Sequence, residues 1–116
     1  MPKQKIILKG IPASPGQTRG KVKIINFPEE VNELNEGEIM VTSFLRPDFI
    51  LAIKMNSTKI SGIITDKGGL TCHAAIIVRE LKVPYIARTV VATKKLKENM
   101  IITINGKKGL IYEEIR

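Results

Sequence analysis

Apolar and polar residues alternate along several short stretches of the chain. The clearest is Gly20 to Asn26, where Lys21-Val22-Lys23-Ile24 has the period of a half-buried strand. Further apolar stretches of strand length lie at residues 6–10, 38–42, 61–66 and 83–87. A last pair of strands, Met100 to Ile104 and Gly109 to Glu113, flanks Asn105-Gly106, a dipeptide typical of tight hairpin turns.

Two helices are predicted between these strands. Pro47-Asp48 opens a short helix over 49–55, with the proline near the first turn. A second helix runs from about Cys72 to Leu81 and has Ala74, Ile77, Val78 and Leu81 on one face. Residues 11–16 are expected to form a loop because they hold two prolines, and residues 27–37 are polar and turn-like. The sum predicts α/β or α+β layers around one core.

The chain has 116 residues, so we expect a single domain over residues 1–116 with room for one modest core. Apolar residues make up 43% and charged residues 26%, which is ordinary for a globular domain. No stretch approaches the roughly 20 apolar residues of a membrane-spanning helix. The apolar stretch near the N-terminus is too short for a signal peptide. A cytoplasmic protein is therefore expected.

The net charge of +8 raises the possibility of nucleic acid or phosphorylated ligands as partners. Lysines are spread along the chain, with small groups only at 94–97 and 107–108, and aromatic residues make up 4%. A base-stacking platform is therefore not evident, and we favour a solvated lysine surface with no nucleic-acid partner and no membrane partner. The nucleic-acid hypothesis would predict salt-sensitive binding.

Cys72 is the only cysteine and His73 the only histidine. A single cysteine excludes an internal disulfide and a multi-cysteine zinc site, so no metal ligands are predicted in this chain. A Cys–His nucleophile pair has to be considered because the two residues are adjacent. Neighbouring residues at a helix start point in different directions and no third orienting group is evident, which disfavours thiol catalysis.

The candidate chemistry lies in Gly68-Gly69-Leu70-Thr71-Cys72-His73-Ala74-Ala75. A predicted strand ends at Asp66, two glycines let the chain turn and approach a ligand closely, and a helix then begins. The first N–H groups of a helix lack partners within the helix, and the helix dipole is positive there. An anion is stabilised at such a position, so a phosphate on the His73 imidazole would be favoured.

His73 is accordingly predicted to be a phosphoryl-accepting nucleophile. The Thr71 hydroxyl would cap the helix or contact the phosphoryl oxygens, and Gly68, Gly69, Cys72 and Ala74 would surround the phosphate. The ordinary alternative is a helix cap or a surface histidine, because a lone histidine at a helix start usually has no further role. The Gly68-Gly69 pair is by itself a common turn and lacks the pattern of a P-loop.

Residues 68–81, with Val83-Pro84 after them, closely resemble the phosphohistidine motif of the phosphoenolpyruvate-utilising enzymes. These are phosphoenolpyruvate synthase, pyruvate phosphate dikinase and enzyme I of the sugar phosphotransferase system; the Thr-Cys-His version looks most like the synthases. The resemblance extends over about residues 8 to 113. Further stretches follow the family's order, at residues 10–16 with Gly20, and at 36–41, 47–48, 62–66, 92–93 and 109–112.

The resemblance implies a three-layer β/β/α swivelling domain that carries a phosphoryl group on His73 between two active sites. One would be an ATP-grasp nucleotide site and the other a TIM barrel that binds phosphoenolpyruvate or pyruvate, with Mg²⁺ at the partner sites and no cofactor in this domain. Neither partner domain is in this chain, so we expect a free-standing carrier subunit that does not turn over alone. The resemblance also implies that Thr71 can be a target of regulatory phosphorylation. The final acceptor stays open.

Two positions depart from the family pattern. Arg88 stands where the family usually has glycine; it could reach a phosphate, but most surface charges lack a specific role, which favours a solvated side chain. Asn99 replaces another common glycine, a mild change because asparagine tolerates left-handed geometry. The alternative to a carrier is a non-catalytic regulatory or interaction module that keeps the fold. The intact Gly68, Gly69, Thr71 and His73 argue against it.

Overall fold

The computed structural model describes residues 3–68 and 73–115. Its elements in chain order are β1 (Lys3–Lys9), β2 (Ile11–Ser14), β3 (Gln17–Ile24), the 3₁₀ helix η1 (Pro28–Glu33), β4 (Glu38–Thr42), α1 (Phe49–Met55), β5 (Ile60–Thr65), α2 (His73–Glu80), β6 (Tyr85–Ala87), α3 (Ala92–Lys95), β7 (Ile101–Asn105) and β8 (Leu110–Ile115). The predicted strand at 38–42 and the predicted helix at 49–55 are confirmed with these bounds.

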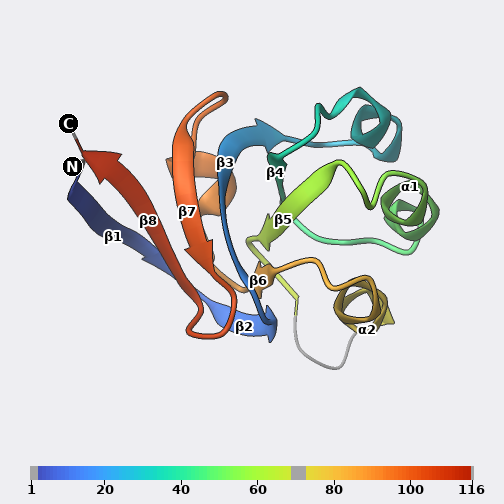
Figure 1. Ribbon diagram of the computed structural model, residues 1–116. Coiled ribbons are helices and arrows are strands. Elements are labelled where there is room, and N and C mark those ends of the chain that lie inside the picture. Colours follow the sequence, from blue (N-terminus) through green and yellow to red (C-terminus); the bar gives the residue numbers. More distant parts are fainter. Residues whose placement is uncertain (1–2, 69–72, 116) are drawn as a thin grey trace.

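The strands form one curled sheet in the order β1-β8-β7-β3-β4-β5-β6-β2 (Figure 1). The sheet has an antiparallel half with β1, β8 and β7 and a parallel half with β4, β5 and β6, and strand β3 belongs to both. Its residues 17–21 pair with β7 in the antiparallel half, and its residues 22–24 pair with β4 in the parallel half. From β3 to β6 all neighbouring strands are parallel. The long β3 therefore lets the sheet fold back on itself into two facing layers.

Two clusters of buried apolar side chains separate three layers, so the predicted β/β/α architecture is confirmed. One cluster lies between the two halves of the sheet and includes Val22, Ile39, Val41, Ile64, Ile86, Ile102, Ile104 and Ile111. The other lies between the parallel half and the helices. Because side chains alternate along a strand, Ile63 joins the helix-side cluster and Ile64 the inter-sheet cluster.

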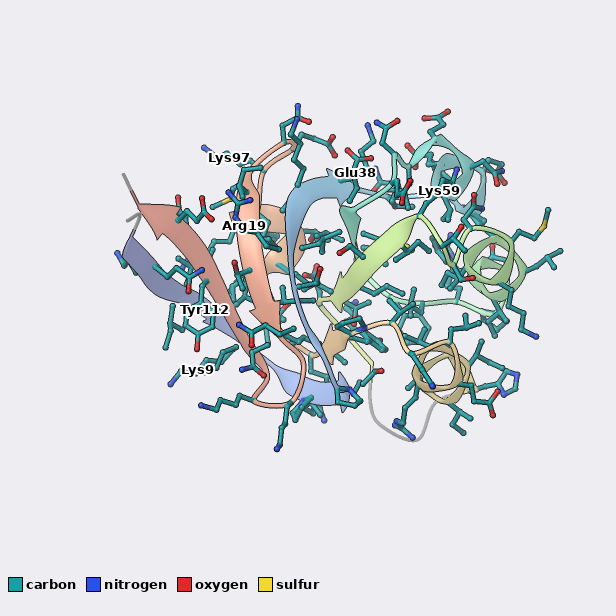
Figure 2. The ribbon with its side chains drawn as sticks, viewed as in Figure 1. Lys9, Arg19, Glu38, Lys59, Lys97 and Tyr112 are labelled. Carbon is teal, nitrogen blue, oxygen red and sulfur yellow. The ribbon has the colours of Figure 1, made fainter. Side chains whose placement is uncertain are left out.

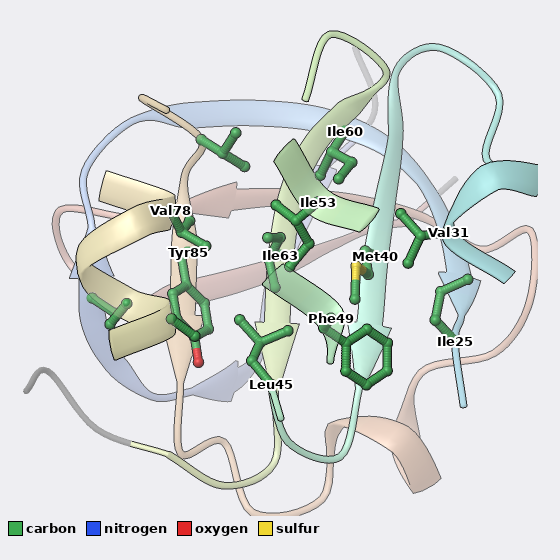
Figure 3. Packing of buried hydrophobic residues seen from close by; sticks show 14 of the residues in the cluster. Ile25, Val31, Met40, Leu45, Phe49, Ile53, Ile60, Ile63, Val78 and Tyr85 are labelled. Atoms are coloured by element: carbon green, nitrogen blue, oxygen red, sulfur yellow. The ribbon is translucent and has the colours of Figure 1, made fainter. Parts of the chain in front are cut away.

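Helices α1 and α2, with η1, cover the outer face of the parallel strands (Figure 1). Phe49 and Ile53 of α1 point toward the strands, and Val78 of α2 lies near Tyr85 of β6 (Figure 3). Helix α2 confirms part of the predicted apolar face: Ala74 and Val78 are buried, Leu81 packs against the core just beyond the helix, and Ile77 is half-buried. The buried side chains of these helices therefore pack against the outer face of the parallel strands.

The prediction that residues 11–16 form only a loop is wrong. Residues 11–14 form strand β2, which pairs with β6 and lies at one end of the strand order. A proline is tolerated in an edge strand because the missing N–H would face away from the neighbouring strand. Pro12 is exposed, in keeping with this edge position.

The predicted closing hairpin is confirmed, but its loop is longer than the Asn-Gly pair suggests. Four residues, Gly106 to Gly109, separate β7 from β8, and the left-handed backbone is at Gly109 with φ 70°. Gly106 is required for another reason: a Cβ there would collide with the carbonyl oxygen of Ser14. The turn-like stretch at 27–37 contains the short η1 helix, whose start is capped by the Glu30 carboxylate accepting from the Asn26 and Phe27 N–H groups.

Charged side chains are distributed over the molecule. Figure 2 shows Lys9 in β1, Arg19 in β3, Lys59 just before β5 and Lys97 after α3. Arg19 forms a two-bond ion pair with Glu114, and this carboxylate raises the pKa of the guanidinium above its ordinary value. The spread of the labelled cations agrees with the solvated lysine surface expected from the sequence.

Candidate functional site at the carboxyl edge of the parallel strands

The carboxyl ends of β4, β5 and β6 lie at the same edge of the sheet because these strands are parallel. Ligands of open α/β sheets are bound at this edge, in the crevices formed by the loops that follow the strands. Here the loops begin at Ser43, Asp66 and Arg88. The β5 loop leads to the start of α2 (Figure 1). The candidate chemistry therefore lies where the fold places a binding site.

His73 is the first residue of α2 and its side chain is exposed. The helix beneath it is firmly held. Ala74 and Ala75 are buried, and Arg79 donates a hydrogen bond from Nε to the carbonyl oxygen of Ala13 in β2, at 3.0 Å. The imidazole is thus presented to solvent from a helix whose other face is anchored in the core.

A buried polar network lies beneath the start of the loop that follows β5 and contains Gly68 and Gly69 (the glycine loop). The Thr65 hydroxyl donates to the carbonyl oxygen of Lys67 at 2.7 Å and lies 3.1 Å from the Tyr85 hydroxyl. Both side chains are fully buried. Gly68 has φ 118°, a conformation suited to glycine, and a Cβ there would lie 3.4 Å from the Tyr85 hydroxyl. The network therefore sets the direction in which the chain leaves β5.

Sequence reasoning missed this network. Its signal is a threonine at the end of one buried strand and a tyrosine in the next, both expected to need partners when buried. Alternation alone cannot say that the two side chains point to the same layer, because that depends on the register between β5 and β6. The structure pairs Ile63 with Tyr85, which places Thr65 two residues further along the same face.

The β5 and β6 loops are tied together by hydrogen bonds. Thr89 N–H donates to the Thr65 carbonyl oxygen at 3.1 Å, and Val90 N–H donates to the Asp66 carbonyl oxygen at 3.0 Å. The Asp66 carboxylate accepts from the backbone N–H of Thr93 at 2.9 Å and from the Thr93 hydroxyl. Residues 65–66 and 89–93 therefore form one hydrogen-bonded rim of the site.

This rim holds two residues in left-handed backbone conformations that glycine would adopt more easily. Arg88 has φ 55° and Val90 has φ 75°. Each costs roughly 1–2 kcal/mol relative to an unstrained conformation, with the β-branched valine the more unusual case. A shallow pocket of about 460 Å³ opens beside them, lined by Asp66, Lys67, Gly68, Arg88 and Val90.

The predicted site residues divide into two groups. His73, Gly68 and Ala74 are placed at the carboxyl edge as just described, with Ala74 buried beneath the helix start. Gly69, Thr71 and Cys72 lie outside the described residues, so the roles assigned to them stay predictions. Within residues 3–68 and 73–115 no group of three His, Cys, Asp or Glu side chains could hold a metal ion. No helix in the described part of the chain is long and apolar enough to cross a membrane.

Comparison with known proteins agrees with this geometry. Residues 34–109 match the family model described as "PEP-utilising enzyme, mobile domain". The chain belongs to this family. The matched stretch contains β4, β5, α2 and β6, and with them the loops that form the carboxyl edge.

Relatives of this mobile domain include phosphoenolpyruvate synthases. The probable phosphoenolpyruvate synthase of Archaeoglobus fulgidus is 50% identical over 109 residues, which cover 94% of this chain and 14% of the synthase. The phosphoenolpyruvate synthase of Pyrococcus furiosus is 44% identical over 110 residues, which cover 95% of this chain and 13% of the synthase. The chain thus spans about one seventh of the length of these relatives, in which the corresponding stretch is one part of a much longer protein.

Solved structures share the fold of this mobile domain. The solution structure of Enzyme I matches with a TM-score of 0.61 and 26% identity, covering 70% of this chain and 32% of that one. The holo-form of aconitase X from Thermococcus kodakaraensis matches with a TM-score of 0.70 and 18% identity, covering 98% of this chain and 99% of that one. The second likeness shows the fold alone, because one fold hosts unrelated functions.

Proposed function

We propose that this mobile domain is a phosphoryl carrier that is transiently phosphorylated on His73. The observation that carries the proposal is the exposed imidazole at the first residue of α2, at the carboxyl edge of the parallel strands. A phosphoryl group there would benefit from the unpaired N–H groups and the positive dipole of the helix start. The family membership supports the same role.

The chemistry would be a pair of transfers. An imidazole nitrogen of His73 forms a bond to phosphorus while the bond between phosphorus and the donor oxygen breaks, and that oxygen keeps the electron pair. In the second step the acceptor oxygen attacks phosphorus and the P–N bond breaks. The chain's own contribution is positioning: α2 is anchored through Arg79 and its buried alanines, and the exposed ring can meet two successive partners.

The partner sites would be an ATP-grasp nucleotide domain and a TIM-barrel domain that binds phosphoenolpyruvate or pyruvate, on the same chain or on separate ones. Mg²⁺ would be bound with the nucleotide or with phosphoenolpyruvate at those sites, where it neutralises phosphate charge. The lengths of the synthase relatives support this arrangement, since this stretch makes up 14% of the Archaeoglobus fulgidus protein.

The alternative is a regulatory or interaction module that keeps the fold without phosphoryl transfer. It requires no accessible nucleophile. The exposure of His73 on a helix anchored in the core meets the requirement of a carrier, and membership in the mobile-domain family of PEP-utilising enzymes favours the carrier over the alternative.

The test is to incubate the chain with phosphoenolpyruvate, Mg²⁺ and the partner domains of a synthase relative, and to record phosphorus NMR spectra. A phosphohistidine gives an acid-labile, base-stable phosphoramidate signal. Because the chain has one histidine, this signal can be assigned by a single substitution, His73→Ala.

The matched control is Glu33→Ala, an exposed residue at the end of η1, which lies on the opposite side of α1 from α2 (Figure 1). We expect the signal in the wild-type chain and in this control, and its loss in His73→Ala. A signal that persists in His73→Ala would refute the assignment, and the absence of signal with every donor and partner would refute the carrier function.

A further inference from the structure

The pocket beside the glycine loop brings two cations together. Lys67 comes from the loop after β5 and Arg88 from the loop after β6, and both line the same pocket with Gly68 between the loop start and α2. Both side chains are exposed. Within the described residues neither Lys67 nor Arg88 has a side-chain hydrogen bond or ion pair.

The one carboxylate in the pocket wall is already engaged. Asp66 accepts a hydrogen bond at 2.9 Å from the Thr93 N–H and a second from the Thr93 hydroxyl. It therefore serves to join the β5 loop to the start of α3 and does not pair with either cation. Its negative charge remains in the pocket wall, so Lys67 and Arg88 leave a net positive charge there, and their N–H donors stay available to an anion.

The rigidity of the rim favours a binding site over a pair of loose surface cations. Thr89 and Val90, the two residues that follow the left-handed Arg88, donate backbone hydrogen bonds to the carbonyl oxygens of Thr65 and Asp66. Strained backbone conformations persist where surrounding contacts impose them, and they cluster at functional sites. The fixed backbone sets the point from which the Arg88 side chain extends, and its planar guanidinium loses less freedom per hydrogen bond than a lysine ammonium does.

We propose that this pocket binds a phosphate-type oxyanion, held by the guanidinium of Arg88 and the ammonium of Lys67. Guanidinium matches the geometry of phosphate oxygens through paired N–H donors, and lysine adds a point charge. The proposal rests on the proposed carrier function for its purpose: the pocket would hold either the phosphoryl group on His73 or a phosphate group of the partner's ligand beside it. Its ligand chemistry is the same in both cases.

The test uses inorganic phosphate as the probe and the full ¹⁵N-labelled chain. Phosphate is titrated at constant ionic strength against chloride, and the amide signals of Gly68 and Val90 are followed. We expect saturable shifts that phosphate causes and chloride does not. Arg88→Gly should weaken binding by about tenfold or more, since a charge-assisted pair is lost.

The chain offers a closely matched control in Lys82→Gly. Lys82 is also an exposed cation with left-handed backbone, at φ 59°, but it follows the far end of α2 and does not line the pocket. Both substitutions remove one positive charge and relieve one strained position. We therefore expect Lys82→Gly to bind phosphate as the wild type does, and Lys67→Gln to bind more weakly than the wild type.

A wild type with no saturable phosphate shifts, or an Arg88→Gly variant that binds as well as Lys82→Gly, would overturn the proposal. A second arm separates the two sources of phosphate. The chain is phosphorylated with phosphoramidate, which transfers its phosphoryl group as its P–N bond breaks and ammonia leaves. If phosphohistidine fills the pocket, added phosphate no longer shifts Val90; if phosphate still binds, the pocket serves the partner's ligand.

The two proposals fail separately. The phosphate titration requires no transfer chemistry, so saturable binding without any phosphohistidine would refute the carrier function and leave the pocket assignment standing. Formation of phosphohistidine without phosphate binding at Arg88 and Lys67 would refute the pocket assignment and leave the carrier function standing.

Discussion

The antiparallel half of the sheet and the carboxyl edge of the parallel half both contain residues with left-handed backbone, but the residue types differ. In the antiparallel half they are Gly109 and Asn99, residue types that adopt this conformation at little cost. At the carboxyl edge the positive φ of Gly68 is met by a glycine, but Arg88 and Val90 adopt left-handed backbone only against steric strain. The antiparallel half therefore carries little backbone strain at these positions, whereas the carboxyl edge has strained residues beside a pocket.

The two regions also differ in how close their backbones approach. At the hairpin between β7 and β8, Gly106 and Gly109 pack directly against carbonyl oxygens of the segment that joins β1, β2 and β3. At the carboxyl edge a Cβ on Gly68 would meet no atom closer than 3.4 Å. An added side chain should therefore damage folding more at the hairpin glycines than at the exposed positions of the carboxyl edge.

The largest effect is expected for Gly109→Ala. A Cβ there would collide with the backbone oxygen of Gly10 while φ is 70°, so both overpacking and strain contribute. We expect a loss of about 3 kcal/mol in the free energy of unfolding, measured by urea denaturation.

The matched control is Gly37→Ala. Gly37 has φ 88° but no atom within 4 Å of an added Cβ, so only the conformational penalty of about 1 kcal/mol applies. Equal losses for the two variants would show that close packing at the hairpin is not what distinguishes this region.

A smaller effect is expected for Thr65→Val, which removes the hydroxyl that bonds the Lys67 carbonyl oxygen and contacts Tyr85. The Lys67 carbonyl oxygen and the Tyr85 hydroxyl each lose a hydrogen-bond partner, and we expect the free energy of unfolding to fall by about 2 kcal/mol. The comparison is Thr103→Val in β7, whose hydroxyl accepts only from the exposed Gln4 amide.

Because that amide can bond to water instead, Thr103→Val should change the unfolding free energy by no more than about 0.5 kcal/mol. Chemical denaturation of both variants decides the matter. If Thr65→Val proves as mild as Thr103→Val, the polar network does not hold the start of the glycine loop.

The smallest expected effect has the opposite sign. Val90→Gly relieves a left-handed β-branched residue that is 73% exposed, so little packing is lost. We expect a gain of about 1 kcal/mol and a melting temperature higher by about 4 °C, measured by calorimetry. Asn99→Gly, at φ 67° in the antiparallel half, should stay within about 0.5 kcal/mol of the wild type because asparagine tolerates this conformation. If Val90→Gly is less stable than the wild type, the left-handed backbone of Val90 is not a source of strain, and the two regions do not differ in this respect.

Much of the fold could be predicted from residue patterns. Residues 38–42 are continuously buried because both faces of β4 are covered, and the apolar residues there predicted a strand with the observed bounds. The edge strand at 11–14 was missed because its proline argues against a strand unless its position at the sheet edge is known. Edge position depends on long-range pairing with β6, which local sequence does not contain.

The candidate site was predictable in part. The glycine pair, the helix start at His73 and the resemblance of the surrounding motif predict a site at the start of α2. The role proposed for Arg88 was not predicted, and a solvated side chain was favoured, because its neighbour Lys67 lies 21 positions earlier in the chain. Only the parallel pairing of β5 with β6 brings the two loops to one pocket.

A pulse–chase measurement tests directly whether His73 accepts a phosphoryl group and passes it on to an acceptor. The chain is phosphorylated with labelled donor, isolated, and mixed with pyruvate, Mg²⁺ and the partner domains of a synthase relative. The account predicts that the label moves from His73 to pyruvate faster than it is lost to water as inorganic phosphate. Label that stays on the chain, or that appears only as inorganic phosphate, would contradict it.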